Sequence, residues 1–479
     1  MLCESHCRQP AKQTSHSLFS KLFTGIMLRV FFRLVFGSRS NRSYDMHPIV
    51  SDSQRFRAAQ WKMLLATMFC YLFYYTGRHN FGWAINGMSD DLGLTNTEIG
   101  WISGSMLACY GLGQAINGNL GDKFGARRLM ALGAILSCIL NWCVSYATSF
   151  GVVLFLWSSN GFAQSLGWAP GSRLISNWWP RNERGKAFGF YTFAAGSSSV
   201  LTYFLSIGVL LMIGLIDADG ETWRWIFRLP VLLLPVGAIL FYFVARDRPE
   251  DLGFVSPADS HNPTDNADDE IDQSRSRDVP AAETSFQRYC SVLSNGRFLI
   301  ACVAIGFESW ARYGLLYWVP VHYLGQDWKG QSDTLWITLS LPVGMALGAL
   351  TAGQLSDRLF RSNRSRPIAI FLGLGSLVTL AMYFVPTSNT YLGMTLLFLA
   401  GFLVYGPQAS FWALCPDLLG RHRAGTGVGI MDACAYGVAA LGEVVIGKIL
   451  DATGTTASVF PVTSAVCAAG AVCILFVRK

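Results

Sequence analysis

Long apolar runs recur along most of this chain and limit it to one class of fold. A membrane-spanning helix needs about 20 mostly apolar residues to cross roughly 30 Å of hydrocarbon, and each run is long enough. The sequence therefore predicts an all-α integral membrane protein with twelve transmembrane helices. The predicted helices lie near residues 60–86, 98–119, 129–147, 150–173, 186–212, 226–245, 297–322, 333–355, 367–386, 390–412, 424–448 and 456–477.

The composition supports a membrane protein. Of the 479 residues, 52% are hydrophobic and 14% are charged, whereas soluble domains carry roughly 25% charged residues. The net charge of +7 does not indicate nucleic-acid binding, because the basic residues between the apolar runs sit in short loops, where membrane topology needs them. The 12 cysteines are scattered without a CxxC pair, as expected of packing residues. We find no phosphate-binding loop, zinc-ligand spacing or hydrolase motif, and expect no metal, no cofactor and no enzyme.

Lysine and arginine are concentrated in alternate loops, which predicts an orientation. The loops near 122–128, 181–186 and 357–366 are basic, whereas the alternate loops contain a single basic residue, Lys329. Because loops rich in Lys and Arg stay in the cytoplasm, both termini are predicted to be cytoplasmic. A plasma membrane, as in the bacterial inner membrane, fits this orientation.

The chain is predicted to have four regions. Residues 1–58 are basic and unlike the remainder, and we expect a disordered or interfacial appendage. Residues 59–245 and 297–479 hold six predicted helices each. Residues 246–296 are hydrophilic, with an acidic run at 265–272, and are expected to form a flexible cytoplasmic linker.

The two six-helix regions repeat a short loop pattern. Gly118-x-Leu-x-Asp-Lys in the first half corresponds to Gly353-x-Leu-x-Asp-Arg in the second. Two similar halves predict pseudo-symmetric bundles, related by an axis along the membrane normal, with a site between them at mid-depth. The candidate gating residues of these loops are Gly118, Asp122, Arg127, Arg128, Gly353, Asp357 and Arg358.

The first predicted helix places a permanent positive charge in the membrane. An arginine at mid-bilayer costs about 2.5–3.5 kcal/mol on insertion scales, which is tolerable if Arg78 faces a watery cavity holding an anion. Tyr71 and Tyr75 share its helical face by their spacing. The alternative is an arginine that reaches the headgroups from the helix end, with tyrosines that only pack.

The loop Gly118-x-Leu-x-Asp-Lys-x-Gly-Ala-Arg-Arg128 and its second copy resemble the loop signature of the major facilitator superfamily. Further motifs are similar to those of the organophosphate:phosphate antiporters, which include glycerol-3-phosphate and hexose-6-phosphate transporters. These motifs are Tyr74-Tyr-Thr-Gly-Arg-His-Asn-Phe81, Gly161-Phe-Ala-Gln-Ser-Leu-Gly-Trp-Ala-Pro170, Trp178-Trp179 with Glu183-Arg-Gly185, Trp310-Ala-Arg-Tyr-Gly314 and Gly401-Phe-Leu-Val-Tyr-Gly-Pro407.

This resemblance implies that two arginines, Arg78 and Arg312, hold the substrate phosphate. It also implies exchange of a small phosphorylated metabolite for inorganic phosphate across the lipid bilayer by alternating access. On physical grounds, two fixed guanidinium groups suit a dianion, because each binds phosphate through two parallel hydrogen bonds. We expect a monomer. Tyrosines that can bind the sugar or glycerol part, or that only pack, are Tyr71, Tyr75, Tyr313 and Tyr405.

Some positions depart from the family pattern. The family's cavity lysine aligns with Gln114, and the glycerol-phosphate transporter's fifth-helix histidine aligns with Ala195, so this cavity carries less positive charge. Glu308 lies one turn before Arg312 and can pair with it.

Acidic residues in predicted helices leave two other functions open. One is a proton-coupled transporter of another organic anion, and the other is a non-transporting membrane sensor of phosphorylated sugars. The candidate coupling groups are Glu308, Asp432 and Glu443.

Overall fold

Helices form the regular structure of the described chain. The computed structural model describes residues 52–213, 222–254, 285–324, 336–359, 364–419 and 424–477. Most of the predicted appendage, residues 1–58, and residues 255–284 of the predicted linker lie outside the described residues. The contacts divide the chain into two units, Met1–Lys62 and Met63–Lys479. In the first unit the described residues form the start of a helix, and the fold described below belongs to the second.

Each half of the chain makes six helical crossings, some of them interrupted. The first-half elements are α2 (Asp52–Tyr74), η1 (Tyr75–Gly77), α3 (Phe81–Leu92), α4 (Asn96–Phe124), α5 (Ala126–Val144), α6 (Phe150–Trp178), α7 (Arg181–Ile213), α8 (Thr222–Ile226), η2 (Pro230–Leu232) and α9 (Leu233–Val244). The second-half elements are α12 (Gly296–Leu324), α14 (Ser340–Leu359), α15 (Ser365–Tyr383), α16 (Thr390–Tyr405), α17 (Gln408–Leu419), α18 (Ala424–Thr453), η5 (Thr456–Ser458) and α19 (Val459–Leu475).

The predicted all-α fold is confirmed. Each of the twelve predicted helices coincides with one of these elements or with consecutive ones. Among the described residues, eight helices are long and apolar enough to span a membrane by composition alone. The remaining crossings are made by α2 with α3, by α4, by α6 and by α14. Of these, α14 is apolar over the short stretch Ser340–Ala352, and the others carry glycines and polar side chains where helices meet.

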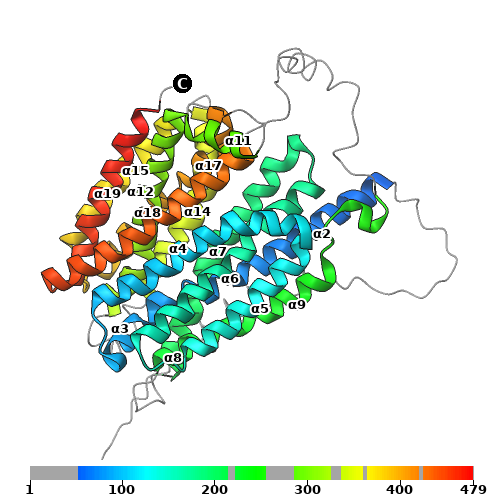
Figure 1. Ribbon diagram of the computed structural model, residues 1–479. Helices are drawn as coiled ribbons and strands as arrows, with labels where there is room; N and C mark the ends of the chain where they lie inside the picture. Colours follow the sequence, from blue (N-terminus) through cyan, green and yellow to red (C-terminus); the bar gives the residue numbers. More distant parts are fainter. Residues whose placement is uncertain are drawn as a thin grey trace, which may run out of the picture. The chain divides into compact units, whose positions relative to one another are not determined.

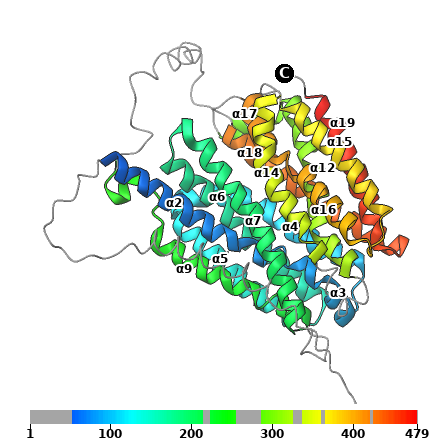
Figure 2. The ribbon, with the colours of Figure 1, turned by 180° about the vertical axis from the view of Figure 1, so that it is seen from behind.

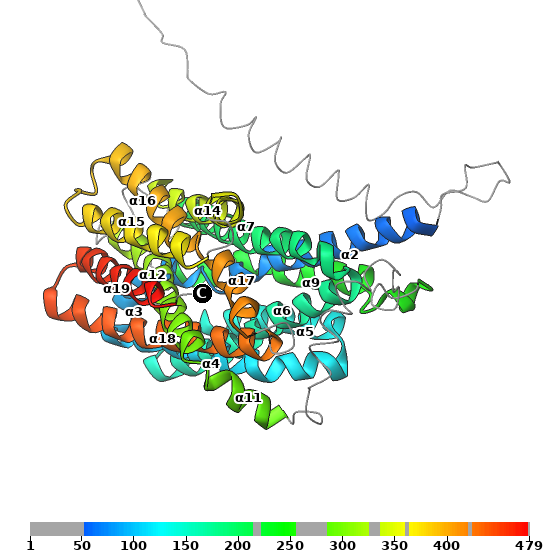
Figure 3. The same ribbon diagram turned by 90° about the horizontal axis from the view of Figure 1, so that it is seen from above.

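Two pairs of long helices join the halves, in addition to the contact of α3 with α12. One is α4 with α18 and the other is α7 with α14. Figure 1 shows α4 beside α18, Figure 2 shows α7 beside α14, and both pairs are seen from above in Figure 3. In each pair the second crossing of one half meets the fifth crossing of the other, as a pseudo-two-fold axis requires.

The helices of this second unit run between two opposite ends of the bundle. We name each end after a glycine with positive φ that lies there. Gly93 has φ 64° and ends α3, and Gly125 has φ 81° and separates α4 from α5. The Gly93 end also carries the loops 145–149 and 454–455. The sequence predicts that this end faces away from the cytoplasm.

α4 residues 96–111 pack closely against α18 residues 433–451 towards the Gly93 end, and we call this contact the seal. The two backbones approach closely: a Cβ atom on Gly100 would lie 2.6 Å from the carbonyl oxygen of Glu443. Small residues allow such close helix contact within membranes.

A carboxylate of α18 caps the first turn of α4 within the seal. Asp451 accepts hydrogen bonds from the backbone amides of Asn96, at 3.0 Å, and Thr97, at 2.7 Å. These amides have no partner within their own helix, and a negative charge is favourable at a helix N-terminus. The seal is therefore held by packing and by hydrogen bonds between the halves.

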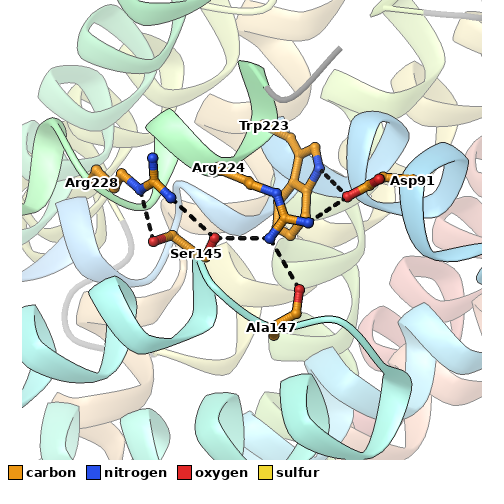
Figure 4. A network of polar contacts seen from close by, with 6 residues as sticks. All are labelled: Asp91, Ser145, Ala147, Trp223, Arg224 and Arg228. Atoms are coloured by element: carbon orange, nitrogen blue, oxygen red, sulfur yellow. Dashed lines mark hydrogen bonds and ion pairs between the residues drawn. The ribbon is translucent and has the colours of Figure 1, made fainter. Parts of the chain in front are cut away.

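A polar network at the Gly93 end ties the first bundle together (Figure 4). Arg224 donates to Asp91 at 2.7 Å and to the carbonyl oxygens of Ser145 and Ala147 at 3.0 and 3.1 Å. Arg224 lies at the end of the bundle where the sequence predicts few basic residues. Its hydrogen bonds to loop carbonyls and to a carboxylate explain why the charge is tolerated there. The residues drawn in Figure 4 are Asp91, Ser145, Ala147, Trp223, Arg224 and Arg228.

Both described ends of the predicted flexible linker contain short helices. η3 (Pro249–Leu252) follows the first bundle, and α11 (Ser285–Leu293) precedes the second. Val292 of α11 is fully buried in a cluster with Phe298 of α12. This apolar contact explains why the end of the segment is helical although its composition is hydrophilic.

Candidate functional site

A cavity lies between the two halves, on the Gly125 side of the seal. Its volume is about 350 Å³ including the open space at its mouth. Most of its lining side chains are aromatic or polar. They are Tyr71, Tyr75, Tyr110, Trp168, Thr192, Ala195, Arg312, Tyr405, Gln408, Trp412, Asp432 and Tyr436.

Arg312 reaches this cavity from α12 and is 4% exposed. Its Nη1 atom donates to Oε1 of Gln408 at 2.9 Å. Its guanidinium carbon lies 4.4 Å from the ring centroid of Tyr313 and 5.3 Å from that of Tyr405. The aromatic faces and the amide hold the guanidinium group in place without neutralising its charge.

Arg78 is positioned by a break in the first crossing. α2 ends at Tyr74, the short 3₁₀ helix η1 follows, and the next α-helix begins only at Phe81. The carbonyl oxygen of Gly77 accepts hydrogen bonds from the side-chain amides of Asn141, at 3.1 Å, and Asn160, at 2.8 Å. Because these amides satisfy a backbone group freed by the break, the interruption is tolerated inside a membrane.

The fully buried Arg78 lies behind the aromatic lining of the cavity. Its guanidinium carbon lies 4.2 Å from the ring centroid of Tyr75 and 4.7 Å from that of Tyr110. Within the described part of the chain, its Nε and Nη1 atoms and Nε of Arg312 have no hydrogen-bond partner. Neither arginine forms an ion pair with a described acidic residue.

Tyrosines connect the two arginines across the interface between the halves. The ring centroids of Tyr110 and Tyr436 are 4.4 Å apart, and the Tyr313 hydroxyl donates to that of Tyr436 at 3.3 Å. Both Arg78 and Arg312 interact electrostatically with Tyr436. The two guanidinium groups therefore lie against the same cluster of tyrosines, although they belong to opposite halves.

This arrangement is suited to an anion. Two buried cations without a bound counter-charge are unfavourable at mid-membrane, and an anion held by both would relieve that cost. The free guanidinium donors can bind a phosphate or carboxylate in two parallel hydrogen bonds.

Some of the other predicted binding residues line the cavity, and others lie outside its lining. Tyr71, Tyr75 and Tyr405 line the cavity. Tyr313 lies behind the lining, against Arg312. Gln114 is mostly buried outside the lining and donates to the Tyr110 hydroxyl at 2.7 Å, so it supports a lining residue.

The predicted ion pair between Glu308 and Arg312 is not formed. Glu308 accepts a hydrogen bond from the hydroxyl of the neighbouring Ser309, at 3.1 Å, while Arg312 donates to Gln408. Their i, i+4 spacing allows the pair, but a residue from α17 provides the closer partner. Asp432 lies two turns into α18 and lines the cavity, where both arginines interact with it electrostatically. Glu443, by contrast, lies in the seal.

The predicted gating residues are only partly described. Arg127 stacks on Tyr242, with 4.2 Å from its guanidinium carbon to the ring centroid, and its backbone amide donates to Asp247 at 2.9 Å. Arg128 is exposed. The remaining gating side chains lie outside the described part of the structure; they are Gly118, Asp122, Gly353, Asp357 and Arg358.

Sequence reasoning missed several lining residues. Tyr110 and Tyr436 meet where α4 crosses α18, and Gln408 begins α17 directly after the Gly-Pro of a quoted motif. Only that motif could have drawn attention to Gln408. The contact between the tyrosines depends on a helix crossing that no local pattern specifies.

The fold and the cavity together define a class. A helical membrane protein with two six-crossing bundles and a cationic cavity between them has an architecture common among membrane transporters. Residues 67–443 match the Major Facilitator Superfamily, and this chain belongs to that superfamily. It is a multi-pass membrane protein of a transporter family rather than an enzyme.

Relatives with assigned functions in their names are similar along most of the chain. The glycerol-3-phosphate transporter of Bacillus subtilis is 25% identical over 82% of this chain and 88% of its own length. A probable hexose phosphate transport protein of Chlamydia trachomatis is 27% identical, covering 81% and 85%. The membrane sensor protein UhpC of Salmonella typhimurium is 26% identical, covering 84% and 89%.

A solved structure has the same fold. It is a bacterial homolog of the human lysosomal transporter Spinster, in an inward-facing and unoccupied conformation. The TM-score is 0.66 at 14% identity, with 88% of this chain and 95% of that chain covered. At this identity the similarity shows the fold alone.

Proposed function

We propose that this protein is a secondary transporter that exchanges a small phosphorylated metabolite, of the glycerol-3-phosphate or sugar-phosphate type, for inorganic phosphate. The observation that carries the proposal is that Arg312 lines the cavity and Arg78 lies directly behind its tyrosine lining, each with guanidinium donors that have no partner among the described residues. Tyr71, Tyr75 and Tyr405 surround the cavity and are suited to bind the organic part. The names of the transporting relatives support the same substrate class.

Exchange follows from the charges of the site. In the empty cavity the two arginines repel each other, and no described ion pair neutralises either of them. Reorientation is therefore favourable with an anion bound, so inorganic phosphate refills the site when the organic phosphate leaves. We place the protein in a bacterial inner membrane as a monomer, with both termini and the Gly125 end in the cytoplasm.

A proteoliposome assay tests this proposal. Vesicles containing the purified protein are loaded with inorganic phosphate, with sulfate or with buffer, and uptake of radiolabelled glycerol-3-phosphate and glucose-6-phosphate is measured. We expect uptake of at least one substrate only into phosphate-loaded vesicles.

Two outcomes would overturn the exchange mechanism in different ways. Uptake that ignores internal phosphate but collapses with a protonophore would identify a proton-coupled carrier of an organic anion. Saturable binding of a sugar phosphate without any flux would identify a sensor, the function named for one of the relatives.

A further inference from the structure

Glu443 lies in the seal, and among the described residues only one of its two carboxyl oxygens is hydrogen-bonded. Its Oε2 atom accepts hydrogen bonds from the Ser103 hydroxyl at 3.2 Å and from the Trp318 indole at 2.9 Å. Among the described residues, its Oε1 atom has no hydrogen-bond partner, and the side chain is fully buried. Ser103 belongs to the first half and Trp318 to the second. One carboxyl group thus connects the halves at a contact that must break when the Gly93 end opens.

No cation accompanies this carboxyl group in the described structure. The α4 segment 99–107, which faces it, contains no titratable residue, and α12 presents only the neutral Tyr317, which interacts with it electrostatically. On α18 itself, Lys448 and Asp451 lie nearer the Gly93 end and are exposed. A carboxylate without a cation in an apolar contact is strongly disfavoured relative to the neutral acid.

The surroundings of Glu443 change when the halves separate. Opening at the Gly93 end parts α4 from α18, removes the bond to Ser103 and admits water to the carboxyl group. Water stabilises the charged form, which the closed seal excludes. The two conformations of the carrier therefore favour different protonation states of the same side chain.

We propose that Glu443 is a proton-binding site controlled by the seal. It holds a proton while the seal is closed, releases that proton to water on the Gly93 side when the seal opens, and takes one up again on closing. The proposal rests on the alternating-access part of the proposed function and adds a ligand to it. It makes opening at the Gly93 end dependent on the pH at that side of the membrane.

The proposal has a quantitative consequence. If opening releases one proton, the ratio of open to sealed protein rises up to tenfold for each unit of increasing pH, in the range between the two protonation equilibria. The ratio is measurable as a distance across the Gly93 end. Asp90 of α3 and Ala452 of α18 are exposed residues of opposite halves and suit spin labels, in a variant without native cysteines.

The test is double electron–electron resonance between these two labels from pH 5 to pH 9, without substrate. In the otherwise unchanged protein we expect the long-distance, open population to grow as the pH rises. Glu443→Gln keeps an oxygen that accepts from Ser103 and Trp318 but cannot release a proton. Its open population should not change with pH.

Ser103→Ala is the matched control, because it removes the bond between the halves and leaves the carboxyl group in place. It should raise the open population at every pH while keeping the pH dependence. A pH dependence in Glu443→Gln equal to that of the parent would overturn the proposal. So would a parent protein whose distances do not change with pH, even if the variant fails to fold. Because no transport is measured, this result is independent of whether phosphate is the exchanged ion.

Discussion

The glycine contacts of the seal allow a direct test of how this protein closes. In Gly100→Ala, the new Cβ atom would lie 2.6 Å from the carbonyl oxygen of Glu443, a backbone atom that cannot rotate away. α4 and α18 must therefore move apart in the sealed state, while the open state accommodates the methyl group. Overpacking of this kind costs roughly 1–3 kcal/mol. The open population should rise about 5- to 150-fold relative to the sealed one.

Gly437→Ala is the matched control for this substitution. Gly437 lies on α18, the other helix of the seal, and a Cβ atom there would meet nothing within 4 Å. Both variants gain the higher helix propensity of alanine, about 1 kcal/mol, so their difference reports the clash. The assay is the label distance between Asp90 and Ala452 at one fixed pH. Equal open populations in the two variants would refute the assignment of this glycine contact to the seal.

Two further predictions concern the Gly93 end. Asp451→Asn removes the charge that caps the first turn of α4, so the seal should weaken by roughly 1–2 kcal/mol; an unchanged open population in the same distance assay would contradict this. Arg224→Gln removes the charge-assisted bonds to Asp91 and to two loop carbonyls, and should lower the free energy of unfolding by about 2–4 kcal/mol. A melting temperature equal to that of the parent protein in detergent would show that the network is not stabilising.

The sequence predicted the fold and the position of the two arginines for identifiable reasons. Twelve apolar runs leave a chain few alternatives in a membrane, and their order sets which helices meet across the pseudo-two-fold axis. A lone arginine in such a run is costly unless it serves a polar site, which made Arg78 a candidate. The resemblance to a known family identified Arg312.

The side-chain partners could not be predicted in the same way. Glu308 and Arg312 have the spacing of a helical ion pair, yet Arg312 donates to Gln408, from a helix that begins 96 residues later. The neighbours of Glu443 likewise come from α4 and α12. Such contacts depend on where helices cross, and local spacing carries no information about crossings.

The central claim is that Arg78 and Arg312 hold the phosphate group. It is tested most directly by equilibrium binding of radiolabelled inorganic phosphate to purified protein, comparing Arg78→Lys, Arg312→Lys and the control Arg366→Lys, which changes an exposed arginine at the start of α15. Lysine keeps the charge but loses the two parallel donors, so each cavity variant should lose roughly 1–3 kcal/mol of binding, about 5- to 150-fold in Kd. The control should bind as the parent does. Phosphate affinity within twofold of the parent in both cavity variants would contradict the account.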